Sequence, residues 1–123
     1  MEKLSIQEEQ AMQAIWKAGE GNLKLILENM DDPKPPYTTL ASTVKNLEKK
    51  GYLVSLLMGN TYFFKPSISE EHYKIKCIQD FVKDYFFESY KELIQFMCDQ
   101  KKLTANDLSE ILAKIEKKNI LQQ

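Results

Sequence analysis

Apolar and polar residues recur at helical spacing along most of the chain, most clearly in residues 37–50. In this segment Leu40, Val44 and Leu47 fall on one narrow face. The opposite face carries hydroxyl, amide and ammonium groups without any acid, from Thr38, Thr39, Ser42, Lys45, Asn46, Lys49 and Lys50. Gly51 then supplies a residue that readily adopts the left-handed conformation of a helix end. The pattern predicts a helix with one face on a core and one polar face available to a ligand.

Two helices and a loop are expected before this segment. Ser5 and Glu8 form a capping-box pattern, which predicts that a first helix starts there. Its expected apolar stripe consists of Ile6, Met12, Ile15 and Trp16. Asn22 can cap a short second helix over 23–30, whose apolar residues are helically spaced. The segment 31–36 contains three prolines and must be a loop.

A β-hairpin and three more helices are expected after it. Residues 52–58 and 61–65 are rich in β-forming side chains, and Gly59-Asn60 between them is a two-residue turn signal. Further helices are predicted to start at Ser69, at Ser89 and at Thr104 with Asp107. The expected fold is mainly α with a small β-hairpin. It comprises a winged helix-turn-helix DNA-binding domain over 1–67 and a helical dimerisation region over 68–123.

The distribution of charge favours DNA as the ligand of the polar helix face. The net charge is only −1, yet residues 34–65 hold five lysines against Glu48 alone. Hydroxyls and an amide can reach base edges in the major groove, and lysines can reach phosphates. The 17 basic residues are all lysine, so the bidentate arginine–guanine contact is not available. An ordinary solvated helix face, or a winged helix that binds another protein without reading DNA, is the alternative interpretation.

Composition argues against several other classes of protein. The 43% hydrophobic and 28% charged content is typical of a soluble globular protein, and no apolar run is long enough to span a membrane. Without a signal-peptide core at Met1–Ser5, a cytoplasmic location is expected. Cys77 and Cys98 are isolated, so we expect buried small side chains rather than a disulfide or metal site. His72 is the only histidine, and we expect no catalytic site, no metal and no cofactor.

The predicted C-terminal helices carry more apolar surface than a small winged domain can cover. The economical solution is a second copy of the chain, which would form a homodimer. The expected interface residues are Phe81, Tyr85, Phe86, Leu93, Phe96, Met97, Leu108, Ile111, Leu112 and Ile115. The alternative is a helical extension folded back on its own domain. A dimer of winged domains would read a palindromic operator.

Several short motifs, in order along nearly the whole chain, resemble the penicillinase repressor family of winged-helix transcriptional regulators. They include Ser5…Glu8…Trp16, Tyr37-Thr38-Thr39, Leu47-Glu48-Lys49-Lys50-Gly51, Lys65-Pro66, Phe81-Val82…Phe86-Phe87 and Thr104…Asp107-Leu108. The resemblance implies a homodimeric repressor that occupies palindromic operators. It also implies that base contacts come from the first turns of the recognition helix, here Thr38, Thr39, Ser42 and Asn46. Asn60, at the hairpin turn, joins the lysines as a further expected DNA contact.

Side-chain chemistry predicts the base preference of such a helix. Threonine methyl groups can pack on the thymine methyl, and asparagine can form two hydrogen bonds with adenine. We therefore expect A·T-rich half-sites in the double-stranded operator.

The resemblance also bears on how a repressor is released. Some family members are cut by a membrane sensor metalloprotease at an Asn-Phe bond in the tail helices. The corresponding pair here is Gln95-Phe96, so it is a candidate cleavage site. The alternative that we prefer is that Phe96 belongs to the dimer core. Copper-responsive relatives carry C-terminal cysteine pairs, which this sequence lacks.

Overall fold

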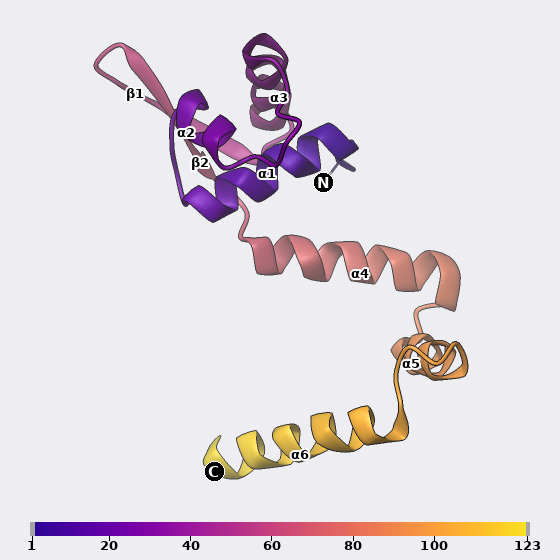
Figure 1. The fold of residues 1–123 in the computed structure, drawn as a ribbon. Coiled ribbons are helices and arrows are strands. Elements are labelled where there is room, and N and C mark those ends of the chain that lie inside the picture. Colours follow the sequence, from indigo (N-terminus) through magenta and orange to yellow (C-terminus); the bar gives the residue numbers. More distant parts are fainter. Residues whose placement is uncertain (1, 123) are drawn as a thin grey trace. The chain divides into compact units, whose positions relative to one another are not determined.

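The computed structural model describes residues 2–122 as six helices and one two-stranded sheet (Figure 1). In chain order these are α1 (Ile6–Ala18), α2 (Leu23–Glu28), α3 (Tyr37–Lys49), β1 (Leu53–Met58), β2 (Thr61–Pro66), α4 (Glu70–Phe86), α5 (Tyr90–Asp99) and α6 (Ala105–Gln122). Three helices followed by a hairpin and further helices confirm the predicted mainly helical winged fold. The chain divides into two compact units, one ending at Lys74 and the other starting at Ile75.

The start of α1 follows from its capping box. The Ser5 hydroxyl accepts a hydrogen bond from the Glu8 amide at 3.1 Å, and the Glu8 carboxylate accepts one from the Ser5 amide at 2.8 Å. Two amides of the first turn that lack helical partners are thereby satisfied. Met12 and Ile15 are buried as expected, but the expectation for Ile6 was wrong, because its side chain is 76% exposed. Ala11 and Ala14 fill the buried stripe instead.

The end of α2 is stabilised by a lysine from the following loop. Asn22 caps the first turn by accepting a hydrogen bond from the Leu25 amide at 2.9 Å. The helix ends at Glu28, slightly earlier than predicted. The Lys34 ammonium then donates to the carbonyls of Leu27 and Met30. A cation is favourable at this position because the unpaired carbonyls give a helix C-terminus partial negative charge. Lys34 therefore serves the fold.

The core of the first unit is centred on α3. Leu40, Val44 and Leu47, the predicted apolar face, are at most 1% exposed. Gly51 follows the helix with φ +85°, the left-handed conformation that its position required. The cluster comprises Leu4, Ala11, Met12, Ala14, Ile15, Ile26, Leu40, Val44, Leu47, Tyr52 and Leu53. These residues come from α1, α2, α3 and β1, with Leu4 just before α1 and Tyr52 just before β1, so the helices and the base of the hairpin share one core.

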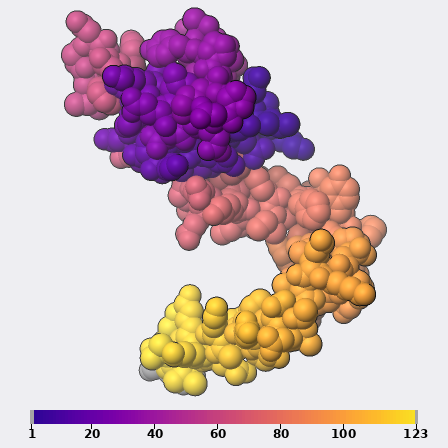
Figure 2. Space-filling model, in the orientation of Figure 1, coloured from indigo at the N-terminus to yellow at the C-terminus, as the bar shows by residue number. Residues whose placement is uncertain are grey.

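The strands β1 and β2 form the predicted antiparallel hairpin. Met58 pairs with Thr61 across the Gly59-Asn60 turn, and the register continues to Leu53 opposite Pro66. At the base, the Phe64 amide and carbonyl both bond Gly21. This short bridge holds the outer edge of β2 to the first unit. The distal part of the hairpin, which we call the wing (residues 54–65), projects from the body of that unit (Figures 1 and 2).

The first unit extends into the beginning of α4. The Trp16 indole donates to the Ile68 carbonyl at 2.9 Å, and the rings of Trp16 and Tyr73 lie 5.3 Å apart. These contacts attach residues up to Lys74 to α1, so the units divide within α4. The assignment of DNA binding to residues 1–67 and of dimerisation to 68–123 stays a prediction about function.

The second unit consists of amphipathic helices with little internal core. Its helix starts lie where they were predicted: the Ser89 hydroxyl accepts from the Glu92 amide, and Thr104 and Asp107 bond each other's amides. Among residues 75–122, Val82 alone is fully buried. The main internal contact between α4 and α5 is aromatic, with the Phe86 and Phe96 ring centres 5.5 Å apart.

Candidate nucleic-acid interface

Most of the polar face of α3 is exposed. Thr38, Ser42, Lys45, Asn46 and Lys49 are all exposed, whereas Thr39 is half-buried. The helix holds this face outward because Leu40, Val44 and Leu47 on the other side are committed to the core. Between its first and last residues only one acid occurs, Glu48, which is half-buried. The exposed surface is therefore positive and rich in short hydrogen-bonding groups.

Two hydroxyls of α3 are bonded to their own helix. Ser42 donates to the Thr38 carbonyl at 3.2 Å, and Thr43 donates to the Thr39 carbonyl at 2.9 Å. A hydroxyl whose proton is used in this way still has lone pairs that can accept a hydrogen bond. Thr43 is buried and belongs to the junction with α1 rather than to the exposed face.

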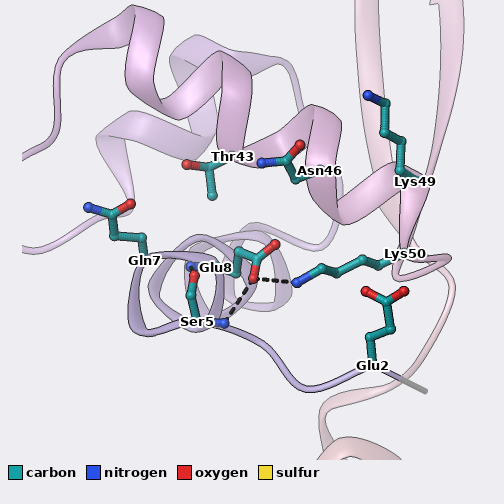
Figure 3. A pocket seen from close by; sticks show the side chains of 8 residues that line it. All are labelled: Glu2, Ser5, Gln7, Glu8, Thr43, Asn46, Lys49 and Lys50. Carbon is teal, nitrogen blue, oxygen red and sulfur yellow. Dashed lines mark hydrogen bonds and ion pairs between the residues drawn. The ribbon is translucent and has the colours of Figure 1, made fainter.

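The lysines of α3 fall into two kinds. Lys45 and Lys49 form no hydrogen bond or ion pair within residues 2–122. Lys50, which follows the helix, donates instead to the Glu8 carboxylate at 2.8 Å (Figure 3). It also lies 3.4 Å from the Lys3 carbonyl. The sequence grouped Lys50 with the DNA-facing lysines because a helical wheel cannot reveal a partner 42 residues away.

The ion pair shifts the titration of both partners. Burial of Glu8, which is 5% exposed, raises the pKa of its carboxyl. Hydrogen bonds from Lys50 and from Ser5 act in the opposite direction and outweigh burial, so the pKa of Glu8 is lowered. The hydrogen bond to Glu8 raises the pKa of Lys50. Both groups are therefore charged at neutral pH, and Lys50 anchors the end of α3 to the start of α1.

A polar depression adjoins the exposed face of α3 at its C-terminal half (Figure 3). Its volume is about 440 Å³, and it is lined by Glu2, Ser5, Gln7, Glu8, Thr43, Asn46, Lys49 and Lys50. Two carboxylates and two ammonium groups balance one another in charge. The depression thus has no net sign that would select a small ion, and it marks the border between α1 and the α3 face.

Most of the wing lacks the positive charges that an element binding DNA phosphates would need. No charged residue occurs between Gly51 and Phe64. Asn60 is exposed at the turn, and Lys65 is the first cation of the hairpin. Large apolar side chains along the wing are exposed, namely Val54, Leu56, Leu57, Met58 and Tyr62. Strand propensity predicted the hairpin, but it did not predict this exposure.

The second unit exposes the apolar residues that the sequence assigned to a dimer interface. Phe81, Tyr85, Phe96, Leu108, Ile111, Leu112 and Ile115 are exposed, whereas Phe86, Leu93 and Met97 are half-buried. The two residues of the candidate cleavage site both lie within α5, and the Gln95 amide donates to Asp99 at 2.9 Å.

The expectation of buried cysteines was wrong for the single chain. Cys77 is exposed and Cys98 is half-buried, because α4 and α5 have no internal core at these positions. His72 is exposed in the first turn of α4, where its ring lies 2.9 Å from the Ser69 hydroxyl. Within residues 2–122, no three His, Cys, Asp or Glu side chains are grouped so that they could hold a metal ion. No helix in the same range has the length and apolarity needed to cross a bilayer.

A polar-faced helix directly before a hairpin, in a unit followed by amphipathic helices, defines the class of winged-helix regulators. The chain belongs to the penicillinase repressor family, whose model matches residues 4–117. This is a family of DNA-binding transcriptional repressors rather than of enzymes. No individual curated protein matches the chain.

Proposed function

We propose that this repressor binds palindromic operators as a homodimer and reads them with α3. The observation that carries the proposal is the exposed face of α3, which combines hydroxyl, amide and ammonium groups while its apolar face is fixed in the core. A helix of this kind fits the major groove, which admits one α-helix and presents a distinct hydrogen-bond pattern for each base pair. As a regulator of transcription it would act in the cytoplasm.

The α3 residues would divide between bases and backbone. Thr38, Thr39, Ser42 and Asn46 are short enough to contact base edges from a helix lying in the groove. Lys45 and Lys49 have ammonium groups without partners among residues 2–122, so they can reach phosphates without breaking an ion pair that the structure describes. Threonine and asparagine favour A·T-rich half-sites. Lys50 would contribute indirectly, since its bond to Glu8 holds the end of α3.

The exposed apolar residues of α4, α5 and α6 support dimerisation through the second unit. An unpaired chain would leave Phe81, Tyr85, Ile111 and Leu112 in water, with Tyr85 70% exposed. Large contiguous apolar surface on a monomer is unfavourable and marks an interaction site. A two-fold symmetric pairing of the same helices would cover it, because a self-complementary patch closes on itself.

Release of the repressor by proteolysis between Gln95 and Phe96 is not favoured by the position of this bond. The bond lies inside α5, and the Phe96 ring packs on Phe86. Cleavage would require local unfolding of α5, since a protease binds its substrate in an extended form. We therefore propose that Phe96 belongs to the dimer core, and a sensor protease stays a prediction.

Selection from random duplexes tests the proposal. The purified protein is mixed with a pool of random double-stranded DNA at two salt concentrations, and the retained duplexes are sequenced. We expect enrichment of a two-fold symmetric, A·T-rich motif whose affinity falls steeply as salt rises.

Asn46→Ala should relax the base preference at one position of each half-site. Lys17→Ala, which removes an exposed lysine at the end of α1, is the matched control and should retain the wild-type motif. An enriched motif without two-fold symmetry would contradict the dimeric reading. Retention without any sequence preference would favour a protein-interaction role instead.

A further inference from the structure

The outer edge of β1 is open along the wing. The sheet has two strands, and β1 pairs with β2 alone in the part of the chain that the structure describes. The outer edge of β2 is occupied at its base, where Phe64 bonds Gly21. An open strand edge presents unpaired amides and carbonyls, and proteins usually protect it with charges or proline. β1 has neither, since its sequence is Leu-Val-Ser-Leu-Leu-Met.

The hydrogen-bond pattern shows which residues of β1 face this edge. The Ser67 amide donates to the Tyr52 carbonyl at 2.8 Å, so the backbone carbonyl of Tyr52 points toward the strand that contains β2. Backbone groups of an antiparallel strand alternate in direction. The amides and carbonyls of Ser55 and Leu57 therefore point away from β2. Phe64 lies opposite Ser55, and its backbone groups point away from β1, since they bond Gly21. This supports the assignment, because opposed residues of an antiparallel pair have the same orientation.

The face of the wing that accompanies this edge is apolar in its β1 half, whereas Lys65 stands opposite Val54 and Thr61 opposite Met58 on the β2 half. Val54, Leu56 and Met58 lie on one side of β1 and are 54%, 62% and 56% exposed. Phe63 stands opposite Leu56 on the same face and is half-buried. An edge strand that carries apolar side chains without charge is suited to pairing with another strand. It is poorly suited to DNA phosphates, because no cation occurs between Gly51 and Phe64.

We propose that the wing pairs with the wing of a second copy of the chain, β1 beside β1 in antiparallel orientation. The pairing would join two hairpins into a four-stranded sheet, with Val54, Leu56 and Met58 of both copies side by side at the centre of one face. A second copy is the occupant that the charges favour, since neither strand brings a charge that the other would have to neutralise. The same edge serves both partners, so the contact can be two-fold symmetric.

The size of the contact determines when it forms. Two six-residue strands bury far less than the roughly 800 Å² per partner of a stable interface. Wing pairing is therefore weak between free molecules. It becomes significant when two repressors occupy neighbouring operators, because binding to one duplex raises their effective concentration. The inference therefore rests on the proposed binding to operators. It assigns to the wing the role of making binding to neighbouring operators cooperative.

Ser55→Pro tests the pairing with little disturbance of the hairpin. Its amide faces the open edge, so proline removes an outward donor and leaves the ladder to β2 intact. Leu56→Thr is a second variant, which removes apolar surface and keeps a β-forming residue. Ile6→Thr removes an apolar side chain of α1 that is exposed even more than Leu56, 76% against 62%, and is the matched control. All three substitutions leave the charge unchanged.

Binding is measured on duplexes with one operator and with two, the spacing being varied over one turn of DNA. Wild type and Ile6→Thr should bind the second operator about 5–150-fold more tightly than the first. Ser55→Pro and Leu56→Thr should lose this cooperativity and retain the affinity for a single operator. Wild-type binding without cooperativity at any spacing would overturn the proposal. A loss of single-operator affinity in both variants would overturn it too, because Ser55 and Leu56 of β1 would then belong to the surface that contacts DNA.

Sedimentation of the free protein separates this proposal from the proposed function. If no operator is found, wild type should still associate beyond the dimer at high protein concentration, whereas Ser55→Pro should not. Identical sedimentation of wild type and Ser55→Pro up to roughly millimolar protein, the effective concentration that one shared duplex can supply, would refute wing pairing, whatever the DNA result.

Discussion

Replacing Lys45 and Lys49 together by alanine should weaken the salt dependence of DNA binding. Both side chains are exposed on α3 and have no partner within the described chain, so each can release a counterion when it meets a phosphate. A homodimer carries four such lysines. At about 0.9 of slope per phosphate contact, their loss should reduce the slope of log K against log salt by about 3.6.

The expected effect on affinity follows from this slope. Between 50 and 200 mM salt, the wild-type protein should lose about 150-fold more affinity than the double variant, as the fourfold salt change raised to the power of about 3.6 gives. Fluorescence anisotropy with the selected operator over a salt series measures both slopes. Lys17→Ala is the control for the loss of an exposed lysine elsewhere and should keep the wild-type slope.

Equal slopes for wild type and the double variant would refute the assignment of these lysines to phosphates. A drop in affinity that is equal at all salt concentrations, with an unchanged slope, would also refute this assignment. It would indicate that the substitutions removed a structural contact and not a contact with phosphate. Circular dichroism of the variant should match wild type, because neither side chain touches the core.

Three further predictions concern stability and assembly. Acidification should destabilise the protein through Glu8. The pKa of its carboxyl in the folded protein is below the ordinary value of 4.5, so the ion pair with Lys50 stabilises the fold above pH 4.5. This stabilisation is lost as pH falls through the pKa of the folded state. Glu8→Gln should make the melting temperature depend less on pH. Lys50→Met should lower the melting temperature at pH 7 while leaving the slope of log K against log salt for DNA binding unchanged. Leu47→Ala should cost about 2–5 kcal/mol of unfolding free energy in urea, against about 0.5 kcal/mol or less for the exposed control Ile6→Ala. Ile111→Asp should shift the sedimenting species from dimer toward monomer; an unshifted dimer would contradict the assigned interface.

The sequence by itself determined the local elements of this protein and their order. A helix start depends on groups three residues apart, as in Ser5 with Glu8, and such patterns are visible along the chain. The same holds for Gly51 after α3 and for the two-residue turn of the hairpin. The apolar face of α3 was also predictable, because helical periodicity alone puts Leu40 and Leu47 on one side.

The tertiary structure decided which side chains remain available for function. Lys49 and Lys50 are adjacent and chemically identical, yet one is exposed and the other is bound to Glu8. The same wheel that selected the DNA-facing residues could not separate them, because the partner comes from a distant helix. Ile6 was predicted inside and lies outside, since α1 buries its alanines against the core instead.

The wing shows the same limit for strands. Its β-forming residues predicted a hairpin, but whether their side chains would be covered depends on what packs against the sheet. The base of the hairpin rests on the core through Leu53, whereas Leu56 and Met58 extend beyond it. Burial is a property of the neighbours that folding brings together, and those neighbours are not encoded in the spacing of the residues themselves.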